Sequence, residues 1–91
     1  MSQHVFQAQR YRVLCGWDRP LQGFFLVIEH PLFDEPCYSN LYETTPHPPT
    51  FEPFLTVLSR HGITPPDGLL DTLAKDKANN AGNSLTEWKT Q

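Results

Sequence analysis

The 91-residue chain has little of several features that would point to a definite class of protein. Its two cysteines, Cys15 and Cys37, are too few to staple a secreted domain, and residues 1–12 lack the apolar stretch of a signal peptide. We therefore expect free thiols and a cytoplasmic location. The longest apolar run covers the five residues 24–28, far short of the roughly 20 that cross a bilayer, so we expect no membrane partner.

Charge of one sign is scarce as well. Ten acids and seven bases give a formal net charge of -3, and neither sign forms a block. A protein that binds nucleic acid through its phosphates usually shows a basic patch or arm. We therefore expect no nucleic-acid partner.

Recognised motifs for metals, phosphates and nucleophiles are missing. The histidines and cysteines form neither C-x-x-C nor H-x-x-x-H pairs, and the five glycines form no phosphate-binding loop. Cys37 follows Asp34 and Glu35, and neighbouring acids raise the pKa of a thiol instead of activating it. We assign no catalytic residue, no metal ligand and no cofactor.

What the chain does contain is a clear strand pattern in its first half. Residues 10–17 alternate in the way of a half-buried strand, and residues 23–30 are aromatic and β-branched, as in a central strand. Residues 18–22 include Pro20 and predict the turn of a hairpin between them. After a further turn at 31–36, residues 37–42 predict a third, more polar strand at an edge.

The second half predicts two helices after a stiff crossover. Residues 43–49 hold three prolines, which exclude a regular helix or a central strand. Thr50 is a candidate cap for a first helix, which Gly62 stops as a left-handed residue. Residues 64–67 resemble a capping box that opens a second helix, ending near Asn79.

These elements predict an α+β fold in one domain, 1–91: a three-stranded antiparallel β-meander followed by a helical hairpin packed on one face. The predicted parts are an N-terminal segment, the meander, the Pro-rich crossover, the hairpin and a polar C-terminal tail, at 1–8, 10–42, 43–49, 50–78 and 79–91. The tail is either frayed or pinned by Trp88.

The sheet carries the functional hypothesis, because its strands are apolar on both faces while the two helices cover one. We place Phe25 and Val27 on the free face, joined by Tyr38, Trp17 or Tyr11, although alternation alone leaves the choice of face open. This indicates a non-catalytic protein-interaction or adaptor domain that binds a protein partner or forms a homodimer. The competing reading is that residues 1–8 or the tail fold back and bury this face.

Two other functions compete with this one. Cys37, His47 and His61 could gather at a cleft between the crossover and the first helix, which would suit a small-molecule site or an enzyme. Residues 58–73 resemble a helix-turn-helix, but Asp67 and Asp71 stand where a DNA-reading helix presents basic or amide groups.

Overall fold

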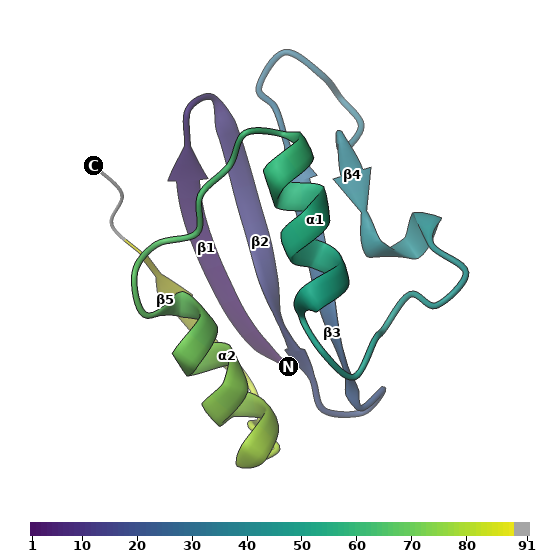
Figure 1. Ribbon diagram of the computed structural model, residues 1–91, viewed down its shortest axis with the longest axis vertical. Helices are drawn as coiled ribbons and strands as arrows, with labels where there is room; N and C mark the ends of the chain where they lie inside the picture. The colour runs from purple at the N-terminus through teal and green to yellow at the C-terminus, as the bar shows by residue number, and fades with distance from the viewer. Residues whose placement is uncertain (89–91) are drawn as a thin grey trace.

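Residues 1–88 are described by a computed structural model, in which five strands form one mixed sheet (Figure 1). The first four strands are antiparallel to their neighbours along the chain, and the fifth runs parallel to the first, giving the spatial order β4-β3-β2-β1-β5. The strands are β1 (Ser2–Ala8), β2 (Tyr11–Asp18), β3 (Gly23–Glu29), β4 (Tyr38–Ser39) and β5 (Ser84–Glu87). The α+β class is confirmed, but the sheet has five strands where the sequence predicted three.

The central hairpin lies where the sequence predicted it. Strands β2 and β3 differ by about one residue at their ends from the predicted ranges 10–17 and 23–30. Asp18 opens the turn between them, and its Oδ1 accepts a hydrogen bond from the Leu21 amide at 3.2 Å. A short polar side chain at the first turn residue commonly stabilises such a turn.

Both ends of the predicted meander need correction. Residues 2–8 form a full strand, in which His4 and Phe6 point toward the helices and are buried there. The third predicted strand, 37–42, is reduced to the two residues of β4 because a 3-10 turn, η1 (Asn40–Tyr42), begins directly after it.

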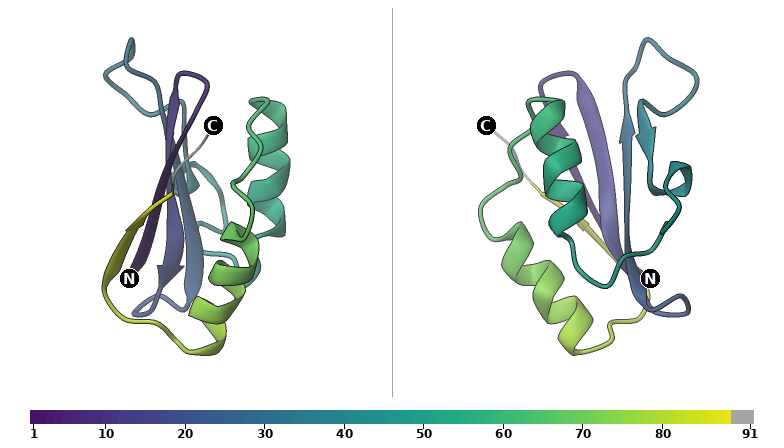
Figure 2. Two further views of the ribbon diagram at one scale, coloured as in Figure 1. Left: turned by 90° about the vertical axis from the view of Figure 1, so that its left-hand side faces the viewer. Right: turned by 45° about the vertical axis from the view of Figure 1, so that its right-hand side comes forward.

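Two helices cover one face of the sheet and leave the other face without a helix (Figure 2, left). Helix α1 spans Glu52–Arg60 and is followed by Gly62 at a φ of 69°, as predicted. The amides of Gly62 and Ile63 donate to the last carbonyls of the helix at 3.0 and 2.9 Å, which is a Schellman cap. The cap predicted at Thr50 is wrong: Phe51 is the N-cap residue and gives no side-chain hydrogen bond.

Helix α2 spans Leu69–Ala78 and starts later than predicted. Its N-cap is Gly68 at a φ of 89°, so the capping box at 64–67 does not open it. A left-handed residue cannot continue a right-handed helix, and residues 64–67 therefore belong to the loop. The predicted end near Asn79 is confirmed, and Asn80 at a φ of 48° completes a second Schellman cap.

The predicted tail at 79–91 is ordered as far as Trp88, and its residues 89–91 lie outside the described range. β5 pairs with β1, and the Trp88 amide donates to Val5 O at 2.8 Å. Within residues 1–88, no helix combines the length and apolarity needed to cross a membrane.

The core lies between the sheet and the helices. The helices contribute Phe54, Val57, Leu58, Leu69 and Leu73 to it, each at most 2% exposed. The facing side chains of the sheet include Phe6, Val13, Cys15, Leu26 and Ile28, which alternate with residues on the opposite face.

Candidate functional site

Trp17 and Tyr38 lie on the helix-covered side and not on the free face. Trp17 is 3% exposed, and its Nε1 donates to Asn80 Oδ1 at 3.1 Å. Tyr38 is equally part of the core, and its hydroxyl donates to Glu43 Oε2 at 3.0 Å. Burial, together with this hydrogen bond, raises the pKa of Tyr38 to about 12. Tyr11 also packs against the core.

Phe25 and Val27 do face away from the helices, since they alternate with the core residues of β3. Phe25 is nevertheless only 7% exposed. A Cβ added to Gly16 would collide with the carbonyl oxygen of Ser2 and lie 3.1 Å from Phe25 Cε1. The first residues of the chain therefore cross the sheet beside the Phe25 ring and cover much of it.

Three partly exposed aliphatic side chains remain open on the helix-free face. Strand pairing sets Val5 opposite Leu14 and Leu14 opposite Val27, so the three form one line across β1, β2 and β3. Directly opposed side chains on one face of a sheet are close enough to contact each other. We call Val5, Leu14 and Val27 the sheet-face row.

A shallow depression borders this row at the end of the sheet that carries the β1–β2 turn. The next line across the sheet is Gln7, Arg12 and Glu29, and Arg12 Nη1 lies 3.0 Å from Glu29 Oε1. Phe33, which is 64% exposed, forms an apolar wall beside these polar groups. We call this hollow of about 460 Å³ the rim depression; its lining residues are Gln7, Arg10, Arg12, Glu29, His30, Pro31 and Phe33.

Aromatic rings connect the rim depression to the core. The centroid of the Phe33 ring lies 5.2 Å from that of His30. The Tyr11 ring makes edge-to-face contacts with His30 and His61, at centroid distances of 5.6 and 5.8 Å. His61 Nδ1 lies 2.8 Å from Val57 O. These contacts fix the imidazole of His61 as part of the packing at the end of α1.

The three residues of the enzymatic alternative do not meet. His47 precedes α1 and packs its backbone against Gly23, whereas His61 follows the helix. The nine residues of α1 lie between the two histidines, and a helix rises by roughly 1.5 Å per residue along its axis. His47 and His61 are therefore at opposite ends of this helix. A hollow of about 320 Å³ does exist between the crossover and α1, but neither histidine nor Cys37 lines it; its lining residues are Glu43, Thr44, Thr45, Pro48, Pro53 and Phe54.

Of the two cysteines, Cys15 is not an activated nucleophile. Both are free thiols, and burial raises the pKa of Cys15 from 9.0 to about 12. Cys37 is partly buried, and its amide donates to Ile28 O at 2.7 Å. Among residues 1–88, no three His, Cys, Asp or Glu side chains gather in a group that could hold a metal ion.

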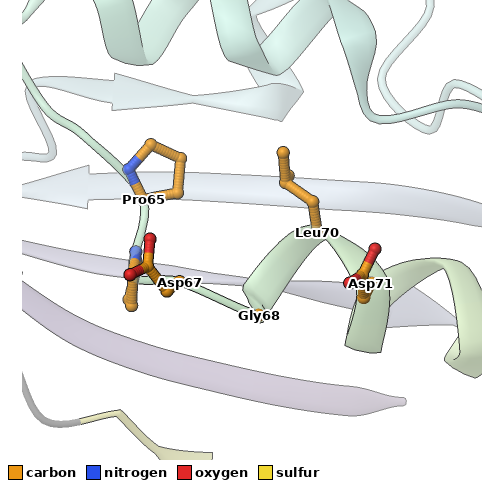
Figure 3. A pocket seen from close by; sticks show the side chains of 6 residues that line it. Pro65, Asp67, Gly68, Leu70 and Asp71 are labelled. Atoms are coloured by element: carbon orange, nitrogen blue, oxygen red, sulfur yellow. The ribbon is translucent and has the colours of Figure 1, made fainter.

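A third hollow lies at the start of α2 (Figure 3). Pro65 and Asp67 come from the loop, and Leu70 and Asp71 come from the first turn of the helix. Both carboxylates are solvent-exposed, and Asp71 is placed where negative charge stabilises a helix N-terminus. Asp71, one of the two acids that argued against DNA reading, therefore has a structural role here.

Sequence reasoning missed Leu14 and Val5 as members of the open face, and Phe33 as its wall. The sequence did contain a signal for Leu14. It lies on the polar side of an alternating strand, between Arg12 and Gly16, and an apolar residue there indicates that this side is not fully exposed to water. Phe33 is one of four strongly exposed large apolar residues near β4, the others being Leu32, Leu41 and Tyr42.

The described surface thus offers an apolar sheet face with a polar rim. Comparisons with protein-family models, with curated proteins and with solved structures found no match to this chain.

Proposed function

We propose that this chain is a non-catalytic protein-interaction domain that binds a second copy of itself through the helix-free face of its sheet. The observation that carries the proposal is the sheet-face row, Val5, Leu14 and Val27, which lies across three adjacent strands on a face that no helix covers. Contiguous apolar side chains in such a place commonly mark an interface.

The size of the face suits a dimer. The molecule extends 35 and 31 Å along its two longer axes and 21 Å along the shortest. Viewed down the shortest axis, the sheet is seen face-on (Figure 1). The broad side of the whole molecule, of which the sheet face is one part, exceeds the roughly 800 Å² that each partner buries in a standard interface.

The charges of the face favour a second copy over a strongly charged partner. Arg12 and Glu29 pair with each other, and the neighbouring Gln7 is neutral. Apart from Glu87, which is opposite Val5 on β5, the charges beside the row are paired, so the face imposes little repulsion on an identical face turned by a two-fold axis. Two sheets packed in this way lie about 10 Å apart, with their inner side chains interleaved.

The test compares two matched substitutions of leucine by glutamate. Leu14→Glu places a carboxylate in the sheet-face row, whereas Leu70→Glu places one on α2, at a residue that is already 43% exposed. Light scattering should give twice the 10.4 kDa chain mass for the unaltered protein and for Leu70→Glu, and the chain mass for Leu14→Glu. Circular dichroism checks that both variants keep their secondary structure.

If the unaltered protein stays monomeric at the concentrations used for NMR, self-association is refuted. A dimer that survives Leu14→Glu and Val27→Glu would refute this face as its interface.

We also propose a reducing, cytoplasmic location, which is supported by the two free thiols.

A further inference from the structure

A chain of two polar contacts joins β1, α2 and the segment after β5. Trp88 Nε1 lies 2.9 Å from His4 Nδ1, and His4 Nε2 lies 2.7 Å from Asp76 Oδ2. His4 is only 2% exposed, so these contacts replace water for both of its ring nitrogens. The self-association proposed above uses none of the three residues.

The chemistry of tryptophan fixes the protonation of this histidine. An indole N–H can only donate, so His4 Nδ1 must accept and carries no proton. The ring is then the neutral tautomer with its proton on Nε2, which donates to the Asp76 carboxylate. A second proton could only go to Nδ1, where it would face the Trp88 N–H across 2.9 Å.

Side-chain burial contributes little to holding β5 in place. All four of its side chains are exposed, so its pairing with β1 depends on backbone hydrogen bonds and on its two ends. At the far end, the Trp88 ring packs 3.7 Å from the position of a Cβ on Gly68. At the near end, the N-terminal amine donates to Asn83 Oδ1 at 2.6 Å. Short edge strands without buried side chains open at low free-energy cost.

We propose that His4, Asp76 and Trp88 form a pH-operated clasp that releases β5 from the edge of the sheet when His4 is protonated. The added proton on Nδ1 turns an acceptor into a donor, and the indole N–H must leave. The imidazolium remains paired with Asp76, which supplies the compensating negative charge. Release of Trp88 frees the end of β5 and uncovers the edge of β1.

Of the other groups that face His4, two bring no charge to it. Cys15 on β2 is opposite His4 and stays a neutral thiol, because burial raises its pKa to about 12. Thr86 on β5 is opposite it on the other side and carries no ionisable group. Asp76 is the facing carboxylate on α2, and histidine is the side chain that gains charge as the pH falls from about 8 to about 5.

Nuclear magnetic resonance of the unaltered protein tests the clasp, with an internal control. Trp17 and Trp88 each give one indole N–H signal, and Trp17 is bonded to Asn80, which does not titrate. Between about pH 7.5 and about pH 5, the Trp88 signal should shift and residues 84–88 should lose at least tenfold in hydrogen-exchange protection factor. The Trp17 signal should keep its position.

Two variants separate the clasp from general acid loosening. His4→Gln keeps a neutral side chain at every pH, so protection of β5 should no longer depend on pH. Asp76→Asn removes the charge that supports the imidazolium, and the midpoint of release should fall by about one pH unit. If His4→Gln does not fold, Asp76→Asn decides alone. An unshifted midpoint in Asp76→Asn, or an unchanged Trp88 signal at about pH 5 in the unaltered protein, would overturn the proposal.

Discussion

At Gly16 the first residues of the chain cross the helix-free face of the sheet. The Trp17 amide donates to Ser2 Oγ at 3.0 Å, which holds Ser2 directly over this position. The ring of Phe25 occupies the remaining space beside it. A single missing side chain therefore allows the chain start to bury an aromatic ring that would otherwise be exposed on this face.

Gly16→Ala should destabilise the protein by about 2 to 3 kcal/mol, because the new methyl group meets a backbone oxygen that is held in the sheet. Gly82→Ala is the matched control. Its Cβ would find only Arg19 Nη1 at 3.6 Å, and we expect a change within about 0.5 kcal/mol. Urea unfolding measures both, and equal effects of the two substitutions would contradict the crossing at Gly16.

Cys15 should make the protein sensitive to alkali. Its pKa is about 12 in the fold against an ordinary value of 9.0, so above about pH 9 the unfolded chain loses a proton that the folded chain keeps. Stability contributed by the neutral thiol is complete below that pH and falls as the pH rises. The stability of the unaltered protein relative to Cys15→Ala should drop by about 1.4 kcal/mol between about pH 8 and about pH 10. A constant difference would show that Cys15 ionises in the fold.

At the scale of elements, the predictable parts were those with a side-chain pattern. Strands β2 and β3 and the stop of α1 at Gly62 follow from alternation, from an apolar run and from one glycine. β5 has no such pattern, because its four side chains are exposed and its position depends on backbone pairing with residues 82 positions earlier in the chain. A single-sequence pattern does not contain that long-range pairing.

The sequence predicted the start of α2 and the residues of the free face incorrectly, for two different physical reasons. Pro65 is compatible with a first helical turn, but the left-handed Gly68 delays the helix until Leu69. For the sheet, alternation fixes which residues share a face and not which face the helices choose. Phe25 and Val27 were correctly paired, whereas Trp17 and Tyr38 belong to the covered side.

Asn80 joins the end of α2 to the central hairpin. It is left-handed at a φ of 48°, and its Oδ1 accepts from Trp17 Nε1 at 3.1 Å and from Gln22 Nε2 at 2.7 Å. Asn80→Gly keeps the backbone shape and should cost about 1 to 2 kcal/mol for the lost hydrogen bonds. Asn80→Ala should cost about 1 kcal/mol more, from the added backbone strain. Thermal unfolding checks the order, and an alanine variant as stable as the glycine variant would contradict it.

At the scale of the whole molecule, the sheet and the two helices form two layers with one buried core between them. The other side of the sheet has no helix over it. An antiparallel sheet can leave one face to water, and then that face is normally polar. Here it combines an aliphatic line with a paired arginine and glutamate. The chain start covers Phe25 but not this line, which is why we assign the line to a second molecule.

Self-association through the helix-free face is the central claim, and methyl resonances recorded during dilution test it most directly. We expect the methyl signals of Val5, Leu14 and Val27 to shift together as the protein is diluted, while those of Leu70 on α2 stay constant. Signals that do not depend on concentration, or shifts confined to Leu41 beside β4, would contradict the account.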